Sequence, residues 1–192
     1  MATEDVLYWP FSGNGSYSYK SGYRLLKDEA KQSKTNRVPT FRDKHLWKTI
    51  WSMRVAQKVM NFLWRACCNA MPTRQALVKR TIIADPICER CRVVIEDPLH
   101  ALWSCSEVDI VWVDQTLWDF HCSMDFDNIK QLVSWIIEEG KQLELFAYTA
   151  WSVWNQRNQV RMKVPATMLH QIPEVSRTIL NDFLSKLLDS GT

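Results

Sequence analysis

Four potential metal ligands near the middle of the chain follow the spacing C-x2-C-x8-H-x4-C. They are Cys88, Cys91, His100 and Cys105, which we call the Cys3His cluster. A CxxC turn brings two thiolates close enough to share one ion, and a histidine and a third cysteine complete a tetrahedron. Sulfur and imidazole ligands suit zinc, whereas calcium and magnesium take oxygen ligands. The spacing therefore predicts one zinc ion per chain, around which the turn-rich residues 84–105 fold.

The complete ligand set indicates a structural role for this ion. Three cysteines and one histidine fill the four positions of a tetrahedral zinc and leave none for a catalytic water. The alternative interpretation, ordinary buried thiols and a core histidine, would be equally good for a lone CxxC pair. Cys67, Cys68 and Cys122 lie outside the pattern, and we expect them to be core residues.

Basic charge is concentrated in the first half of the chain. Residues 20–80 hold 15 basic and 3 acidic side chains, a net charge of +12, whereas residues 81–192 hold 9 and 16, a net charge of −7. A field of positive sign attracts phosphate groups, although basic helix surfaces are often only solvated. We predict RNA or DNA contacts in the basic half, at Lys44, Lys48, Arg54, Lys58, Arg65, Arg74, Lys79 and Arg80.

The spacing of apolar residues predicts a mainly α fold. Five Gly and seven Pro are few for the length and favour packed helices joined by short turns. Thr73 is expected to cap a short helix that Arg80 closes. Apolar residues recur at three- and four-residue intervals in two helices between residues 44 and 69 and in further ones over residues 108–118, 129–137, 143–162 and 168–188.

The beginning of the chain has a different pattern. An apolar run, a Ser-Gly-Asn-Gly turn and an alternating segment predict a β-hairpin over residues 6–19. Ser18 or Ser21 is then expected to cap a helix. A polar stretch near residues 121–127 divides the chain into a zinc-knuckle-like domain, residues 1–122, and a C-terminal helical extension, residues 123–192.

Three tryptophans lie among the basic residues. Trp47, Trp51 and Trp64 have aromatic faces on which unpaired bases can stack. Their helical spacing favours a place in the core instead. We therefore expect core packing and keep base stacking as the alternative.

The sequence lacks membrane and export signals of the usual kind. The first residues have no basic segment followed by an apolar run of signal-peptide length, and no segment approaches about 18 uninterrupted apolar residues. We expect an intracellular protein, nuclear or cytoplasmic, with no membrane contact and no small-molecule substrate.

In order and spacing, these motifs resemble the zinc-binding domain that follows the reverse transcriptase in plant non-LTR (LINE-type) retrotransposons. The resemblance covers about residues 6–118, and WSVWNQRN at residues 151–158 resembles a helix that follows in the same polyproteins. The usual Pro-Pro pair is missing near Ala56. The other matching residues are Gly15–Ser18, Lys20–Tyr23, Trp47, Ile50, Trp51, Lys58, Val59, Phe62–Arg65, Met71–Thr73, Leu77, Arg80, the Cys3His cluster and Trp112.

The resemblance implies a zinc-binding module derived from a retroelement polyprotein. We expect no enzyme activity, because the Asp-Asp pair of a polymerase is absent and the chain stops where a ribonuclease H domain would begin. The function favoured by the residues is non-catalytic contact with nucleic acid through basic helices. The alternative is a protein-interaction module or an inert helical fragment, whose protein partner the sequence does not identify.

Overall fold

The computed structural model describes residues 41–114 and 116–189, together with Ser16, Ser18 and Ser21. The chain divides into two compact units, Met1–Phe41 and Arg42–Thr192. In the first unit, the Oγ of Ser18 accepts a hydrogen bond from the Ser21 N–H at 3.2 Å, and the Oγ of Ser21 accepts one from the Ser18 N–H at 3.0 Å. This reciprocal pair is a helix-capping box. The predicted β-hairpin over residues 6–19 lies outside the described residues.

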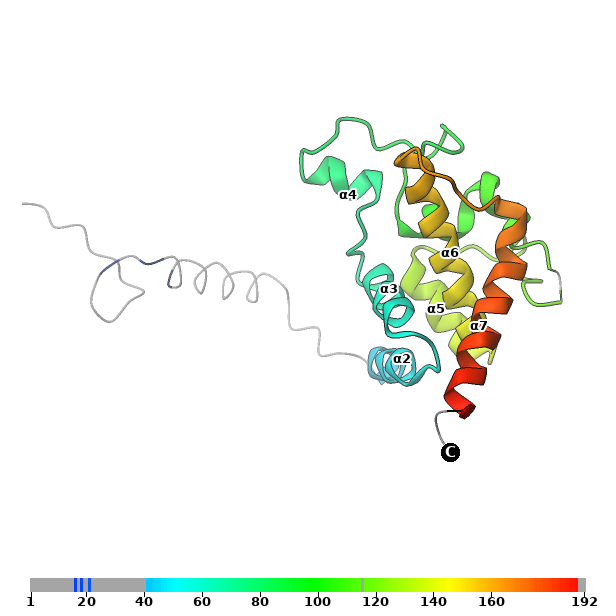
Figure 1. Cartoon of the computed structure of the whole chain (residues 1–192). Helices are drawn as coiled ribbons and strands as arrows, with labels where there is room; N and C mark the ends of the chain where they lie inside the picture. Colours follow the sequence, from blue (N-terminus) through cyan, green and yellow to red (C-terminus); the bar gives the residue numbers. More distant parts are fainter. Residues whose placement is uncertain (1–15, 17, 19–20, 22–40, 115, 190–192) are drawn as a thin grey trace, which may run out of the picture. The chain divides into compact units, whose positions relative to one another are not determined.

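The described part of the second unit is mainly helical (Figure 1). Its strand-like pairing is limited, in the described residues, to an antiparallel bridge between Ile87 and Ile95. The predicted mainly α fold is therefore confirmed. The helices are α2 (Phe41–Ser52), α3 (Gln57–Cys67), α4 (Arg74–Lys79), α5 (Ile129–Glu138), α6 (Leu143–Arg161) and α7 (Ile172–Asp189), with a π-helical segment η1 (His100–Ser104) and 3-10 segments η2 (Ser106–Val111) and η3 (Leu169–Gln171).

Local residue choice explains where several of these helices begin and end. Thr73 caps α4 by accepting a hydrogen bond from the Ala76 N–H at 3.4 Å, as the sequence predicts. Asn128 caps α5 in the same way, through the Gln131 N–H at 3.0 Å. After α5, Gly140 has a φ of +62°, the left-handed conformation with which many helices end.

Helix α6 is the centre of the second unit. It contacts α3, α5, α7 and η1, and it lies between α3 and α7 in Figure 1. Residues 145–150 are all buried, so this stretch of α6 is covered on every side. None of the described helices is long and apolar enough to cross a membrane.

An aromatic cluster joins the segment after the Cys3His cluster to α6. The ring centroids of Trp103 and Trp112 are 4.8 Å apart, and those of Trp112 and Phe146 are 5.4 Å apart. The buried Trp112 indole N–H donates to the Leu102 carbonyl oxygen at 3.1 Å, which satisfies its polar atom. Trp118 completes the cluster in a T-shaped contact with Trp112. Part of the high tryptophan content is therefore core packing.

The predicted helix over residues 108–118 is wrong. The segment starts as the 3-10 turn η2, which ends at Val111. Asp114 then accepts hydrogen bonds from the backbone N–H and the hydroxyl of Thr116, at 3.1 and 2.6 Å. Such side-chain bonds to nearby backbone compete with helical hydrogen bonds. The apolar residues 108, 111 and 112 are buried through tertiary packing.

The predicted boundary between residues 122 and 123 stays a prediction. Buried side chains on its two sides belong to one hydrophobic core, which runs from Leu46 to Ile172. Phe120 on one side and Trp135 on the other have ring centroids 4.2 Å apart. The helical extension therefore shares its core with the zinc-knuckle-like segment.

Candidate metal centre

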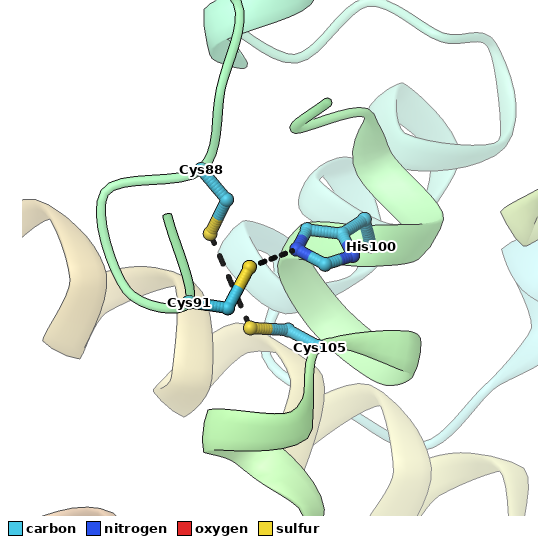
Figure 2. Close-up of side chains that lie close together, drawn as sticks. All are labelled: Cys88, Cys91, His100 and Cys105. Carbon is cyan, nitrogen blue, oxygen red and sulfur yellow. Dashed lines mark hydrogen bonds between the residues drawn. The ribbon is translucent and has the colours of Figure 1, made fainter. Parts of the chain in front are cut away.

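The first two residues of the Cys3His cluster lie on a tight loop. The Cys88 N–H donates to the Val94 carbonyl oxygen at 2.8 Å, and the Arg92 N–H donates to the Cys88 carbonyl oxygen at 2.9 Å. Arg92 has a φ of +58°, which closes the loop. These bonds hold the backbone so that the thiols of Cys88 and Cys91 point to the same side (Figure 2).

The other two residues lie at opposite ends of η1. Asp97 starts this helical stretch, because its carboxylate accepts a hydrogen bond from the His100 N–H at 2.7 Å. In a π-helix the backbone bonds join residues i and i+5. Cys105, five residues after His100, is therefore brought back toward the His100 side of the helix. This local geometry explains the four-residue spacer between the two ligands.

The donor atoms of the Cys3His cluster lie within 4.8 Å of one another. The sulfurs of Cys88 and Cys105 are 4.0 Å apart, and the Cys91 sulfur is 3.3 Å from Nε2 of His100 (Figure 2). With Zn–S bonds of about 2.3 Å and Zn–N bonds of about 2.0 Å, a tetrahedron separates two sulfurs by about 3.8 Å and a sulfur from a nitrogen by about 3.5 Å. The cluster is therefore able to hold one zinc ion.

The environment of the cluster affects each ligand differently. Burial raises the pKa of the Cys105 thiol to about 12. Burial acts in the same direction on Cys91, but hydrogen bonds from the Val93 and Val94 backbone outweigh it and lower the pKa of that thiol. Burial lowers the pKa of His100, which favours the neutral imidazole that a metal requires.

Arg90, inside the CxxC turn, was not singled out by sequence reasoning. Its guanidinium donates to the Ala101 carbonyl oxygen at 3.0 Å, and to the Val153 carbonyl oxygen and the Gln156 side chain at 2.9 Å each. Val153 and Gln156 belong to α6. Arg90 therefore attaches the metal loop to the central helix. Residue spacing does not predict these hydrogen bonds, because the partners are more than 60 residues apart in the chain.

A buried ion pair was also missed. Glu96 and Arg157 form a salt bridge with side-chain exposures of only 2% and 5%. Glu96 additionally accepts a hydrogen bond from the Arg74 backbone N–H at 2.9 Å. Glu96 directly precedes the η1 region and Arg157 lies on α6. Like Arg90, this pair therefore connects the metal-binding segment to α6.

The eight predicted nucleic-acid residues differ in how accessible they are. Arg74 is engaged: it pairs with Asp85 at 3.1 Å and with Glu89, and its side chain is 13% exposed. Lys58 makes one contact although it is exposed, since its ammonium group lies 4.6 Å from the centre of the Trp151 ring. The seven remaining side chains are exposed: Lys44, Lys48, Arg54, Lys58, Arg65, Lys79 and Arg80.

Two of the three tryptophans expected in the core are exposed. Trp51 is 45% exposed and Trp64 is 38% exposed. Their ring centroids lie 6.1 Å apart, so they cover each other partly at the surface where α2 and α3 meet. Trp47 is half-buried and packs against the core. Core packing is therefore wrong for Trp51 and Trp64, since their helical spacing continues past the buried face.

Fold and site together define a small helical module with a zinc-binding cluster. The chain belongs to the family described as zinc-binding in reverse transcriptase, which matches residues 17–112. That range contains the complete Cys3His cluster. The family resemblance inferred from the sequence is confirmed.

One relative comes from Arabidopsis thaliana and is provisionally named a ribonuclease H protein. It is 29% identical over 109 residues, which are 57% of this chain and 16% of the relative. The chain thus matches about a sixth of the relative's length. No solved structure matches the chain.

Proposed function

We propose that the chain is a non-catalytic module in which the Cys3His cluster binds one structural zinc ion. The observation that carries the proposal is that all four donor atoms lie within 4.8 Å of one another, with 3.3 Å between the Cys91 sulfur and Nε2 of His100 and 4.0 Å between the sulfurs of Cys88 and Cys105. Burial supports a structural role, since Cys88 and Cys105 are at most 1% exposed and leave little access for a substrate. The relative's name refers to a protein of which the match covers only 16%, so we carry no ribonuclease activity over from it.

Elemental analysis of the purified chain tests the zinc proposal. We expect about one zinc per chain, and loss of both metal and fold in the Cys88→Ser, Cys91→Ser double variant. Cys68→Ser is the matched control, because Cys68 is an exposed thiol outside the cluster. A wild-type chain that folds fully without metal would remove the proposal.

We further propose that the exposed cations on α2 and α3, Arg54 between these helices, and the cations at the end of α4 contact the phosphates of RNA or DNA. Support comes from the exposure of seven of the eight predicted residues. Residues 42–80 hold nine basic side chains and one acidic side chain, a net charge of +8, which adds to this support because such a field concentrates polyanions at the surface. The family's description, zinc-binding in reverse transcriptase, agrees with a setting in which nucleic acid is present.

Fluorescence anisotropy with labelled RNA and DNA at two salt concentrations tests this contact. Each neutralised phosphate contributes about −0.9 to the slope of log K against log salt on duplex DNA and about −0.7 on single strands. We expect tight binding at low salt that weakens steeply as salt rises. A chain that binds neither nucleic acid at low salt would contradict the proposal.

One observation favours the alternative of a protein partner. Helix α7 has 18 residues, of which only Ile172 and Ser176 are buried. Val175 on this helix is 38% exposed. One face of the helix packs on α6, but Leu187 and Leu188 are exposed as well as Val175, which leaves apolar surface for another protein. The two functions are separable, because truncation before α7 would reduce protein binding and leave salt-sensitive nucleic-acid binding in place.

A further inference from the structure

A hollow of about 260 Å³ lies between α3 and α6, outside the Cys3His cluster. Helix α3 contributes residues at positions i, i+3, i+4 and i+7, and α6 contributes residues at i, i+3 and i+4, so each helix presents one face to it. The residues that matter here are Lys58, Asn61 and Arg65 from α3, and Trp151, Trp154 and Asn155 from α6.

The wall from α6 is aromatic. Trp151 is half-buried, and the ammonium group of Lys58 lies 4.6 Å from the centre of its ring. Trp154 is buried, with the Arg157 guanidinium 4.7 Å from its ring centre. Trp151 is therefore the ring whose face an incoming group can reach, since an exposed lysine gives up a cation–π contact at little cost.

The rim of the hollow is polar and positive. Arg65 is exposed and uses one nitrogen to donate to the Ala70 carbonyl oxygen at 3.3 Å, which leaves further donors of its guanidinium for an anion. The side-chain amide of Asn155 makes no hydrogen bond within the part of the chain that the structure describes. An amide of this kind offers both a donor and an acceptor, which are the groups on the edge of an unpaired base.

We propose that this hollow binds one unpaired nucleotide of a single-stranded nucleic acid. The base stacks on Trp151, the Asn155 amide bonds to its edge, and Arg65 and Lys58 bind the flanking phosphates. The hollow is smaller than the roughly 300–1,000 Å³ pockets that bury drug-sized ligands, and a single base is a suitably smaller group. Inside a duplex both faces of a base are covered by its stacked neighbours, so the ring of Trp151 cannot stack on it, and the Watson–Crick edge is already paired.

The inference rests on the proposed contact with nucleic acid and makes it more specific. It assigns part of the recognition to α6, which follows the residues that match the family. It also requires the bases themselves, whereas the basic surface of α2–α4 requires only phosphates. That difference separates the two proposals experimentally.

Fluorescence anisotropy with three labelled single strands of equal length tests the site: oligothymidylate, oligouridylate and an abasic deoxyribose-phosphate chain. Stacking of one base on one aromatic ring changes affinity by about fivefold or more. We expect Trp151→Leu to weaken binding of at least one base-containing strand by about fivefold or more, and to leave the abasic strand within about twofold of wild type. The strand that weakens identifies DNA or RNA as the ligand.

Two further variants complete the test. Asn155→Leu removes the donors and the acceptor of the amide without changing the charge, at a half-buried position where leucine has nearly the same size and shape as asparagine. It should weaken the same strands even if Trp151→Leu fails to fold. Trp135→Leu is the control, since Trp135 is half-buried on α5 and packs against Phe120, away from the hollow.

The outcomes distinguish the two proposals. If wild type binds all three strands equally and the Trp151 and Asn155 variants change nothing, the nucleotide site is overturned while the phosphate-contacting surface stands. If wild type binds no strand at low salt, the nucleic-acid function fails and the nucleotide site fails with it.

Discussion

Glu96 and Arg157 form an ion pair that is almost completely buried, although 61 residues separate them in the chain. Glu96 lies just before the helical stretch that carries His100 and Cys105, and Arg157 lies on the central helix α6. The ion pair therefore connects the segment that contains His100 and Cys105 to the core. The aromatic packing of Trp103 and Trp112 connects the same segment to the core.

Removing one partner of this pair should destabilise the fold strongly. Glu96→Gln leaves the Arg157 guanidinium buried without its counter-charge, which costs about 3–5 kcal/mol for pairs of this type. Urea denaturation of the zinc-loaded protein would measure the change in the free energy of unfolding. The control is Asp119→Asn, whose exposed pair with Lys141 should contribute almost nothing. Equal effects of the two substitutions would contradict the assignment.

Arg90 should contribute to stability in addition to the metal ligands beside it. Arg90→Met keeps the apolar stem and removes three hydrogen bonds, so we expect a loss of about 3 kcal/mol in the free energy of unfolding. Arg92→Gly is the matched control on the same loop, since Arg92 is exposed and glycine adopts its positive φ readily. A small effect of Arg90→Met would mean that the loop is held by the metal alone.

The six cysteines should differ in reactivity. The expectation of core residues is confirmed for Cys67 and wrong for Cys68 and Cys122, which are exposed. Burial raises the pKa of the Cys67 thiol to about 12 and keeps it protonated. Brief alkylation of the zinc-loaded protein at pH 8 should therefore modify Cys68 and Cys122, with Cys68 slowed because partial burial raises the pKa of its thiol and the thiolate is the reactive form.

A chelator changes the expected labelling pattern. Withdrawal of zinc should expose the three thiols of the Cys3His cluster to alkylation, as the loop and η1 lose the ion that joins them. Peptide mapping by mass spectrometry identifies the labelled positions. Full labelling of Cys88 and Cys105 before chelator is added would show that no metal protects them.

The salt dependence of nucleic-acid binding should separate two arginines that the sequence treats alike. Arg65 is exposed, whereas Arg74 is held by Asp85 and Glu89. We expect Arg65→Ala to make the slope of log K against log salt shallower by about 0.7–0.9, and Arg74→Ala to leave that slope unchanged. A larger change for Arg74 would mean that its ion pairs open when nucleic acid binds.

Local pattern was a good guide wherever a feature depends on neighbours along the chain. Apolar spacing predicted a helix within residues 44–69, and Val59, Phe62, Leu63 and Ala66, which recur there at three- and four-residue intervals, are the buried face of α3. The cap at Thr73 and the extents of α5 and α6 were predicted within about two residues, because capping residues and apolar periodicity act over a few positions. The same periodicity misled at residues 108–118, where Asp114 forms a turn instead.

Some properties of the Cys3His cluster can likewise be predicted from the sequence, and others depend on the tertiary structure. Which four residues come together, and that zinc suits them, follows from their type and spacing, since a CxxC turn and a nearby histidine and cysteine need few contacts from elsewhere. What holds the cluster in the molecule does not follow from spacing. Arg90 and Glu96 find their partners on α6 more than 60 residues away, and only the packed fold brings them within hydrogen-bond distance.

Tertiary structure determined which side chains are accessible at the surface, both by engaging a charged residue and by leaving aromatic residues exposed. The charge count located the basic half of the chain, but Arg74 is held there in ion pairs. Trp51 and Trp64 lie outside the buried faces of α2 and α3 and are exposed. The hollow beside Trp151 joins faces of two helices that are far apart in the chain. Residue type and spacing determined the metal ligands and most helices, because those depend on local chemistry. The accessible cations and aromatic rings depended on which helices pack together.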